Sequence, residues 1–289
     1  PRSICFRSTE FYLMKPLGLN GGVQLGCRTN TDGVPYLASQ CFSPPVHLSK
    51  PYYDEHTGAL LINLSCPTAG LLSGDRMICD IDISDKASMV VTTPGATRSH
   101  FMRSGIAKVE QKFRVSDGSF LEFNPGSLIL QKSTSLEQKT LIDAGENAEV
   151  LYVEKILPGR LAHGESFEFS KFSNCLRMQK DERLILLENF ILDPQNESVY
   201  PWRNSFGSPF YGCLYLLSPK VSQNLPCRQV IHDMMTENLL VGVTSMHREA
   251  GWIIKVLAGD PYEFRNAMKE IRELLYEAIG RFPTKFRRY

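Results

Sequence analysis

The sequence lacks the features that mark several large classes of protein. No apolar run approaches the roughly 18 residues that span a bilayer, and the N-terminus lacks the charged-then-apolar pattern of a secretory signal. Lys and Arg number 32 against 31 for Asp and Glu, and this balance argues against a nucleic-acid or anionic-membrane surface. We therefore expect a cytoplasmic protein with no nucleic-acid partner and no membrane partner.

Nucleotide-binding, hydrolase and zinc motifs are missing as well. There is no G-x-G-x-x-G and no G-x-S-x-G, and the P-loop spacing of Gly21–Gly26 is followed by Cys27-Arg28 instead of Lys-Ser/Thr. The eight cysteines include no C-x-x-C, and the six histidines show neither H-x-H nor H-x-x-x-H. Scattered cysteines of this kind are typical of reduced core residues. The sequence predicts no permanently bound cofactor and no locally encoded catalytic centre.

The dominant pattern in the middle of the chain has a period of two residues. In Lys108–Val115 this pattern places Val109, Phe113 and Val115 on one face, as in a half-buried strand. Similar runs are Phe120–Phe123, Leu128–Leu130, Thr140–Asp143, Glu149–Leu157, Ser166–Phe172, Arg183–Leu192 and Gly212–Leu217. Turn signals such as Asp117-Gly118 separate them. The pattern predicts a mainly β fold with a large antiparallel multi-stranded β body.

The C-terminal part changes character. Residues 193–209 contain three prolines and predict a loop. Helical spacing then covers 228–240, a hairpin pattern covers 240–257, and an N-cap at Asp260 followed by Pro261 starts a helix that ends at Gly280. We expect one domain over residues 1–289. It comprises a β body of about 35–225 and a helix-hairpin-helix part of about 226–289, with two α-helices near the C-terminus.

Two glutamates stand out because they interrupt apolar strand faces. By alternation, Glu154 shares a face with Tyr152 and Ile156, and Glu188 shares a face with Leu184 and Leu186. A carboxylate on an apolar face needs a partner, water or a cation, because burying it bare costs several kcal/mol. The two glutamates are either salt-bridged residues near a strand edge or parts of an internal polar path.

Four short segments are dense in glycine, proline and polar residues, and each alone is typical of a β-turn. They are Pro51–Glu55, Pro67–Asp75, Thr92–Arg98 and Gly159–Phe167. In order and spacing they resemble the motifs P-F/Y-Y-P-E, P-G-G-hydrophobic-hydrophobic-G-G-D, T-x-P-G-A-[ST]-[KR] and G-R-x-x-x-G-E-x-F of the UreD family of urease accessory proteins, also called UreH. Ala69 and Ser73 replace two glycines of the second motif. The resemblance spans roughly residues 35–280.

The resemblance implies a non-enzymatic maturation factor. Proteins of this family bind apo-urease, the urease structural subunits without metal, and join the accessory proteins UreF and UreG to direct nickel into the urease active site. Their fold is largely β with two helices, and a polar tunnel is the proposed nickel route. Carried over residue by residue, the acidic positions of that route are Glu55, Asp75, Glu154 and Glu188. Arg98 matches the basic position after the P-G-A-[ST] turn.

Nickel in transit requires weak, exchangeable oxygen or imidazole ligands, since a high-affinity cage would trap it. Spaced carboxylates without a Cys/His cluster fit that requirement. Two other hypotheses remain open: a β-rich hydrolase or isomerase that uses paired carboxylates such as Asp75 and Glu154, and a β-rich adaptor with no metal role. If the chain is a urease-assembly scaffold, the tail after Gly280 is a candidate docking element for UreF. Its deletion should leave the β body folded.

Overall fold

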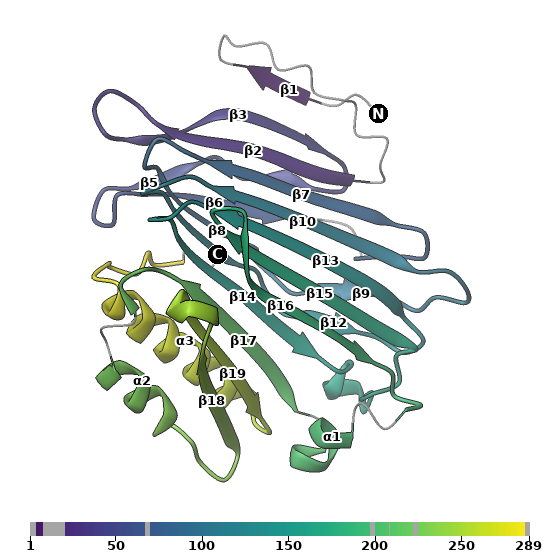
Figure 1. Cartoon of the computed structure of the whole chain (residues 1–289). Helices are drawn as coiled ribbons and strands as arrows, with labels where there is room; N and C mark the ends of the chain where they lie inside the picture. Colours follow the sequence, from purple (N-terminus) through teal and green to yellow (C-terminus); the bar gives the residue numbers. More distant parts are fainter. Residues whose placement is uncertain are drawn as a thin grey trace.

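The computed structural model describes residues 4–7, 21–66, 70–196, 200–207, 209–221 and 225–286, and it shows two large β-sheets lying face to face (Figure 1). One sheet has eight strands in the order β1 (Ile4–Arg7), β3 (Pro35–Ser43), β2 (Gly21–Thr29), β7 (Arg76–Ile83), β10 (Ala107–Val115), β13 (Ser135–Ala144), β15 (Lys171–Lys180) and β16 (Arg183–Leu192).

The second sheet has eleven strands. Its main order is β18 (Leu239–Ser245), β19 (Gly251–Ala258), β17 (Phe210–Leu217), β14 (Glu149–Leu157), β11 (Phe120–Asn124), β8 (Ser88–Thr92), β6 (Ala59–Ser65) and β4 (His47–Leu48). Three short strands pair beside this path, namely β5 (Tyr52–Asp54), β9 (Thr97–Ser99) and β12 (Leu128–Leu130). The mainly β prediction is confirmed. The β body also extends upstream of residue 35, because β2 joins the eight-stranded sheet.

The central strands are parallel, so the expectation of an antiparallel body is wrong there. After β7, β10 and β13 the chain turns into β8, β11 and β14 of the opposite sheet, and neighbouring strands within each sheet therefore run in the same direction. The turn at Asp117-Gly118 carries the same sequence signal whether the next strand pairs with the previous one or crosses to the other sheet. Antiparallel pairs occur towards the edges, for example between β15 and β16 and between β17 and β19.

Helices α2 (Leu225–His232) and α3 (Pro261–Ala278) lie together beside β17, β18 and β19, whereas α1 (Tyr200–Phe206) lies apart from them (Figure 1). Helix α3 packs against β17 and β19, and α2 packs against α3 and β18. The predicted start of α3 is confirmed, because Asp260 Oδ1 accepts hydrogen bonds from the amides of Tyr262 (2.8 Å) and Glu263 (2.9 Å). In the described part of the chain, no helix is both long and apolar enough to cross a membrane.

Three sequence-based boundaries need correction. Helix α2 ends at His232, because Thr236 and Leu239 form a bridged turn that leads into β18. The predicted loop 193–209 contains helix α1 (Tyr200–Phe206), while residues 197–199 and 208 lie outside the described residues. The run 166–172 is mostly irregular, because Phe167 has a positive φ of 54°; β15 begins only at Lys171.

Two hydrophobic cores result from this layering. The larger one lies between the sheets, and the second lies between the eleven-stranded sheet and helices α2 and α3. Strand β14 contributes to both cores, since Val150 and Tyr152 face the first and Leu151 and Val153 face the second. By alternation, Glu154 points between the sheets and Lys155 points away from them. Strand β14 therefore presents one carboxylate to the interior of the molecule.

Candidate functional site

Glu154 is the centre of a hydrogen-bonded network between the two sheets. The residue is 5% exposed. Its Oε1 accepts hydrogen bonds from Gln138 Nε2 (3.0 Å), the Tyr152 hydroxyl (3.0 Å) and Asn174 Nδ2 (3.1 Å), and its Oε2 also lies 3.1 Å from Asn174 Nδ2. Gln138 on β13 and Asn174 on β15 are register partners in the opposite sheet. Both sheets therefore contribute donors to one buried carboxylate.

The partners of Glu154 set it apart from the other buried glutamates. Four glutamates are buried among the described residues, and three of them bond guanidinium groups: Glu122 to Arg272 (2.5 Å), Glu149 to Arg281 (2.6 Å) and Glu165 to Arg160 (2.6 Å). The donors to Glu154 are neutral amides and a phenol. No Lys, Arg or His of the described chain lies within ion-pair distance of this carboxylate. Glu154 is thus the buried glutamate whose partners in the described chain are all neutral.

The environment shifts the proton equilibria of this network. Burial raises the pKa of Glu154 to about 7, and the nearby charge of Glu188 acts in the same direction. Hydrogen bonds from Asn174, Tyr152 and Gln138 oppose that shift, because they stabilise the carboxylate. Burial also raises the pKa of Tyr152 well above its ordinary value. Tyr152 therefore stays a neutral donor near pH 7, whereas Glu154 exchanges its proton there.

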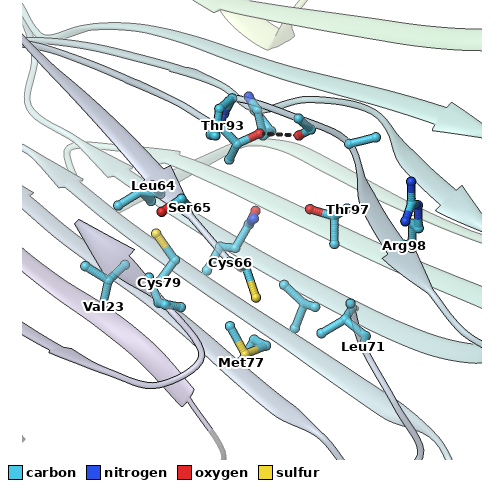
Figure 2. Close-up of a pocket in the computed structure, with 18 of the residues that line it drawn as sticks. Val23, Leu64, Ser65, Cys66, Leu71, Met77, Cys79, Thr93, Thr97 and Arg98 are labelled. Atoms are coloured by element: carbon cyan, nitrogen blue, oxygen red, sulfur yellow. Dashed lines mark hydrogen bonds between the residues drawn. The ribbon is translucent and has the colours of Figure 1, made fainter. Parts of the chain in front are cut away.

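The network reaches a cavity at one end. The Tyr152 hydroxyl lies 2.8 Å from Gln111 Oε1, and Gln111 is one of the residues that line a cavity of about 390 Å³. Figure 2 shows the wall of this cavity, where Cys66, Cys79 and Arg98 come from different strands or turns. A phenol has one proton, so Tyr152 donates either to Gln111 or to Glu154 at any moment. The hydroxyl thus links the cavity to the buried carboxylate.

Glu188 forms a second polar cluster near the Glu154 network, and its charge acts on Glu154 although no hydrogen bond found among the described residues joins the two. Its Oε2 accepts a hydrogen bond from the Tyr215 hydroxyl (3.0 Å), and its Oε1 accepts one from Lys255 Nζ (2.5 Å). The Lys255 side chain is about half exposed to solvent. Cys213 is the register partner of both Glu154 and Lys255 across the strands. Two neighbouring polar clusters therefore lie in the inter-sheet core, one next to the cavity and one next to a solvent-exposed lysine.

The structure brings together some of the residues expected from the sequence and separates others. Glu154 and Glu188 come from opposite sheets and lie near enough for the charge of Glu188 to act on Glu154, and Arg98 lies at the cavity that adjoins the Glu154 network. Glu55 lies in an exposed turn between β5 and β6. Residues 67–69 of the second motif lie outside the described residues.

The face assigned to Glu188 needs one correction. A β-bulge shifts the pairing of β16 with β15 near Met178 and Gln179, and Leu184 is consequently exposed. Leu186, Phe190 and Leu192 of β16 share the face of Glu188 and pack in or against the inter-sheet core, and Ile185 at the bulge is buried there as well. Strict alternation along the sequence could not show this offset.

Asp75 has a local role. It lies in the turn before β7, where its Oδ2 accepts a hydrogen bond from the Leu72 amide at 2.7 Å. Neither Asp75 nor Glu154 lines the 390 Å³ cavity or a second, larger cavity beneath α3. Acid–base catalysis by this pair would require both carboxylates to face one substrate site, and these cavities do not provide one.

The sequence pattern did not single out several polar residues of the network, because their neighbours along each strand are apolar and predict ordinary core packing. Gln111 lies between Val109 and Phe113, and Asn174 lies between Phe172 and Leu176, on faces that are otherwise apolar. A polar side chain at the centre of such a face is a detectable signal. The same signal at the same register on adjacent strands, as in the Gln138–Asn174 pair, predicts an interior network.

The fourth motif is explained by packing. The Arg160 guanidinium bonds Glu165 Oε2, and Glu165 Oε1 accepts the Lys132 amide at 2.8 Å. A Cβ on Gly159 would lie 2.3 Å from the Glu165 carbonyl oxygen, so this close approach requires glycine. The segment is therefore a structural clamp that holds the turn before β15.

Comparison with known proteins identifies the family. A family profile described as UreD urease accessory protein matches residues 20–288. The chain is 33% identical over 270 residues to a urease accessory protein UreD of Opitutus terrae, a match that covers 93% of this chain and 98% of the relative. The chain belongs to the UreD family. A UreD of Acetivibrio thermocellus is 24% identical over 255 residues (85% and 94% coverage), and one of Yersinia enterocolitica is 27% identical over 248 residues (81% and 76% coverage).

Membership in the UreD family supports a role in urease maturation. The match spans both sheets and helix α3, so it includes every residue of the Glu154 network. The predicted family and the mainly β fold are therefore confirmed.

Replacing Glu154 with Gln tests the proton equilibrium in this UreD-family chain. The pKa of Glu154 is 4.5 in the unfolded chain and about 7 in the folded one. Between these pH values the folded protein holds a proton on Glu154 that the unfolded chain has lost. The wild type therefore loses stability as the pH rises from about 4.5 to about 7. A neutral Gln avoids that loss. The stability gain of Glu154→Gln should therefore grow by about 3 kcal/mol between pH 4.5 and pH 8.

Urea unfolding of both proteins at these two pH values measures the difference. Asn174 Oδ1 is buried without a hydrogen-bond partner in the described structure, and rotation of that amide lets it accept from the introduced glutamine amide or from a protonated Glu154. The exposed Glu182→Gln serves as the matched control and should show no pH-dependent difference. A gain that is equal at both pH values would contradict the shifted proton equilibrium.

Proposed function

We propose that this UreD-family protein is a non-enzymatic scaffold for urease maturation and that the Glu154–Glu188 network carries nickel in transit. Its partners on this proposal are apo-urease and the accessory proteins UreF and UreG. Family membership supports the choice of partners, and the interior network supports the metal role. Nickel is cargo in this scheme, and it moves through the protein towards urease.

The observation that carries the proposal is the buried carboxylate of Glu154. Burying a carboxylate costs several kcal/mol unless charge or hydrogen bonds compensate, and the other buried glutamates bond guanidinium groups. Glu154 has neutral donors, and the carbonyl oxygen of neighbouring Asn174 lacks a hydrogen-bond partner. A passing divalent cation would satisfy both groups, because carboxylate and amide oxygens bind such ions.

The ligand set also favours transit over storage. Among the described residues, no group of three or more His, Cys, Asp or Glu side chains is placed to hold a metal ion. One or two carboxylates with amide oxygens bind a divalent cation more weakly than a complete cage and release it more readily. Lys255 lies at the exposed end, where its pairing with Glu188 must break before that carboxylate binds a cation. On this proposal, the route offers a divalent cation several weak, exchangeable oxygen ligands, one after another.

Nickel loading of urease tests the proposal directly. The double variant Glu154→Gln, Glu188→Gln keeps the size and most hydrogen bonds of both side chains but removes both negative charges. Urease matured with it should contain roughly half or less of the wild-type nickel, because oxygen sites lose cation affinity as charged ligands are removed. Nickel per urease active site is measured by metal analysis, alongside the yield of complexes with apo-urease, UreF and UreG.

Two controls separate the metal role from the scaffold role. Glu182→Gln removes an exposed charge at the start of β16 and should leave nickel loading unchanged. The complex yield of the double variant should equal that of the wild type. Full nickel loading by the double variant would remove the conduit role, whereas a loss that tracks a lower complex yield would show that the glutamates only support the scaffold.

A further inference from the structure

A second cavity lies on the opposite side of the eleven-stranded sheet from the Glu154 network. Its volume is about 660 Å³, and it is bounded by the outer face of β14, helix α3, the segment 283–286 and the turns near residues 93–96 and 124–127. Val153, Lys155 and Leu157 of β14 line it, whereas Glu154 points to the other face of the same strand. The turn 93–96 separates this cavity from the 390 Å³ cavity and lines both, whereas Glu154 faces away from the cavity described here.

The floor of this cavity is apolar and preformed. Phe264 and Met268 of α3 are buried, and both line the cavity together with Val153. The C-terminal wall is fixed, because Arg272 donates a hydrogen bond to the Thr284 carbonyl oxygen at 3.0 Å and its guanidinium lies 4.3 Å from the centre of the Phe286 ring. An occupant with an apolar side chain would find this pocket without a large rearrangement.

The lining of the cavity carries an excess of positive charge. Its basic residues are Lys155, Arg265, Lys269, Arg272 and Lys285, and its acidic residue is Glu273. Arg272 is neutralised by Glu122, which is buried outside the cavity lining. Glu273 lies 3.8 Å from Lys269, a long contact between two largely exposed side chains. The net charge that an occupant meets is thus positive.

Two cations at the rim of the cavity, unpaired within the described chain, favour a negatively charged occupant. Arg265 and Lys285 are exposed, and neither forms an ion pair with any carboxylate of the described chain. Arg265 stacks over Tyr262 with its guanidinium carbon 5.3 Å from the ring centre, which positions its charge beside the cavity. The two residues come from α3 and from the C-terminal segment, so they flank the opening from two different elements.

We infer that this cavity is a docking site for a short acidic protein segment that also carries an apolar anchor residue. Charge complementarity selects carboxylates at the rim, and the apolar floor takes the anchor. Cavities of about 300–1,000 Å³ enclose drug-sized molecules, so a single phosphate or carboxylate would leave most of this volume unfilled. The inference goes beyond the proposed function, and it does not depend on nickel passing through the protein.

Fluorescence anisotropy with the full-length chain tests the inference. The probe is a fluorescein-labelled peptide of sequence Glu-Asp-Leu-Glu-Phe-Asp-Glu, and the comparison peptide has Gln and Asn in place of Glu and Asp. The acidic peptide should bind at least about tenfold more tightly than the neutral one, and its affinity should fall as salt rises from about 50 to about 300 mM. A third peptide with Ser in place of Leu and Phe should also bind more weakly.

Charge reversal at the rim localises the binding. The double variant Arg265→Glu, Lys285→Glu should weaken the acidic peptide at least about tenfold. The matched control Lys171→Glu, Arg177→Glu reverses two exposed cations on β15 of the other sheet and should bind as the wild type does. Equal affinity for the acidic and neutral peptides would overturn the inference, and so would wild-type affinity in the rim variant.

A competition experiment decides between a protein segment and a free anion. Inorganic phosphate and acetate are titrated against the bound acidic peptide at constant ionic strength. The inference requires that both displace it only at concentrations far above that of the peptide. Displacement at concentrations comparable to that of the peptide would identify a small-anion site and overturn the protein-segment occupant.

Discussion

Replacing Arg272 with Ala is expected to destabilise the protein by about 3–5 kcal/mol, because it leaves a buried carboxylate without its cation. Glu122 is fully buried, and its two oxygens lie 2.5 and 2.6 Å from the Arg272 guanidinium. Tyr276 donates a further hydrogen bond to Glu122 at 2.5 Å. This cluster joins α3 to β11, so its loss removes a large part of the roughly 5–15 kcal/mol typical of a folded domain.

Urea unfolding at pH 7.5 measures the effect. Arg265→Ala lies on the exposed face of the same helix and should change the free energy of unfolding by less than about 0.5 kcal/mol. The double variant Glu122→Gln, Arg272→Met removes both charges and should recover at least half of the loss, since a neutral pair carries no uncompensated buried charge. If Arg272→Ala and Arg265→Ala are equally stable, the buried ion pair has no structural role.

Deleting the C-terminal segment after Gly280 should also cost about 1–3 kcal/mol, because it removes the guanidinium from a buried carboxylate that keeps only the ion pair with Lys220. Arg281 Nε lies 2.6 Å from Glu149 Oε2, and Glu149 is 3% exposed. The deletion also removes the Thr284 carbonyl that accepts a hydrogen bond from Arg272. The structure thus predicts lower stability after truncation, a cost that the expectation of a folded β body did not include.

This result would change how partner binding by the tail is tested. A truncated protein that fails to bind UreF has lost stability as well as surface, so the two causes cannot be separated. Phe282→Ala is the better variant, because Phe282 is 67% exposed and its removal should change stability by less than about 0.5 kcal/mol. Urea unfolding of the truncated protein, Arg281→Ala and Phe282→Ala gives the comparison. Wild-type stability of the truncated protein would contradict the role of the Arg281–Glu149 pair.

Local signals in the sequence predicted several strands and both ends of α3 well. The runs at 149–157 and 183–192 match β14 and β16, because each has a continuous apolar pattern bounded by turn residues. The start of α3 followed from Asp260 and Pro261, which act through their own backbone neighbours. The irregular stretch 166–170 was mispredicted as strand, since Phe167 and Phe169 alternate as buried residues in a segment without regular backbone structure.

The candidate site was predictable only in part. Glu154 and Glu188 were found because a carboxylate in an apolar run is anomalous within its own strand. Gln138 and Asn174 are unremarkable one by one, and they become partners of Glu154 only through strand pairing and the packing of one sheet on the other. Glu55 was expected to lie on the same polar route as Glu154 and Glu188. The hairpin between β5 and β6 places it in an exposed turn instead.

The sequence by itself determined the UreD family, the mainly β composition, the helix α3 and the presence of carboxylates inside apolar strands. Each of these depends on residues close together in the chain or on ordered motifs. Only the tertiary structure decided that the central strands pair in parallel and that a basic cavity lies beneath α3. It also decided that Glu154 has neutral donors, whereas the other buried glutamates bond arginines. These properties arise from contacts between residues up to about 150 positions apart, and such contacts are fixed by how the sheets and helix pack.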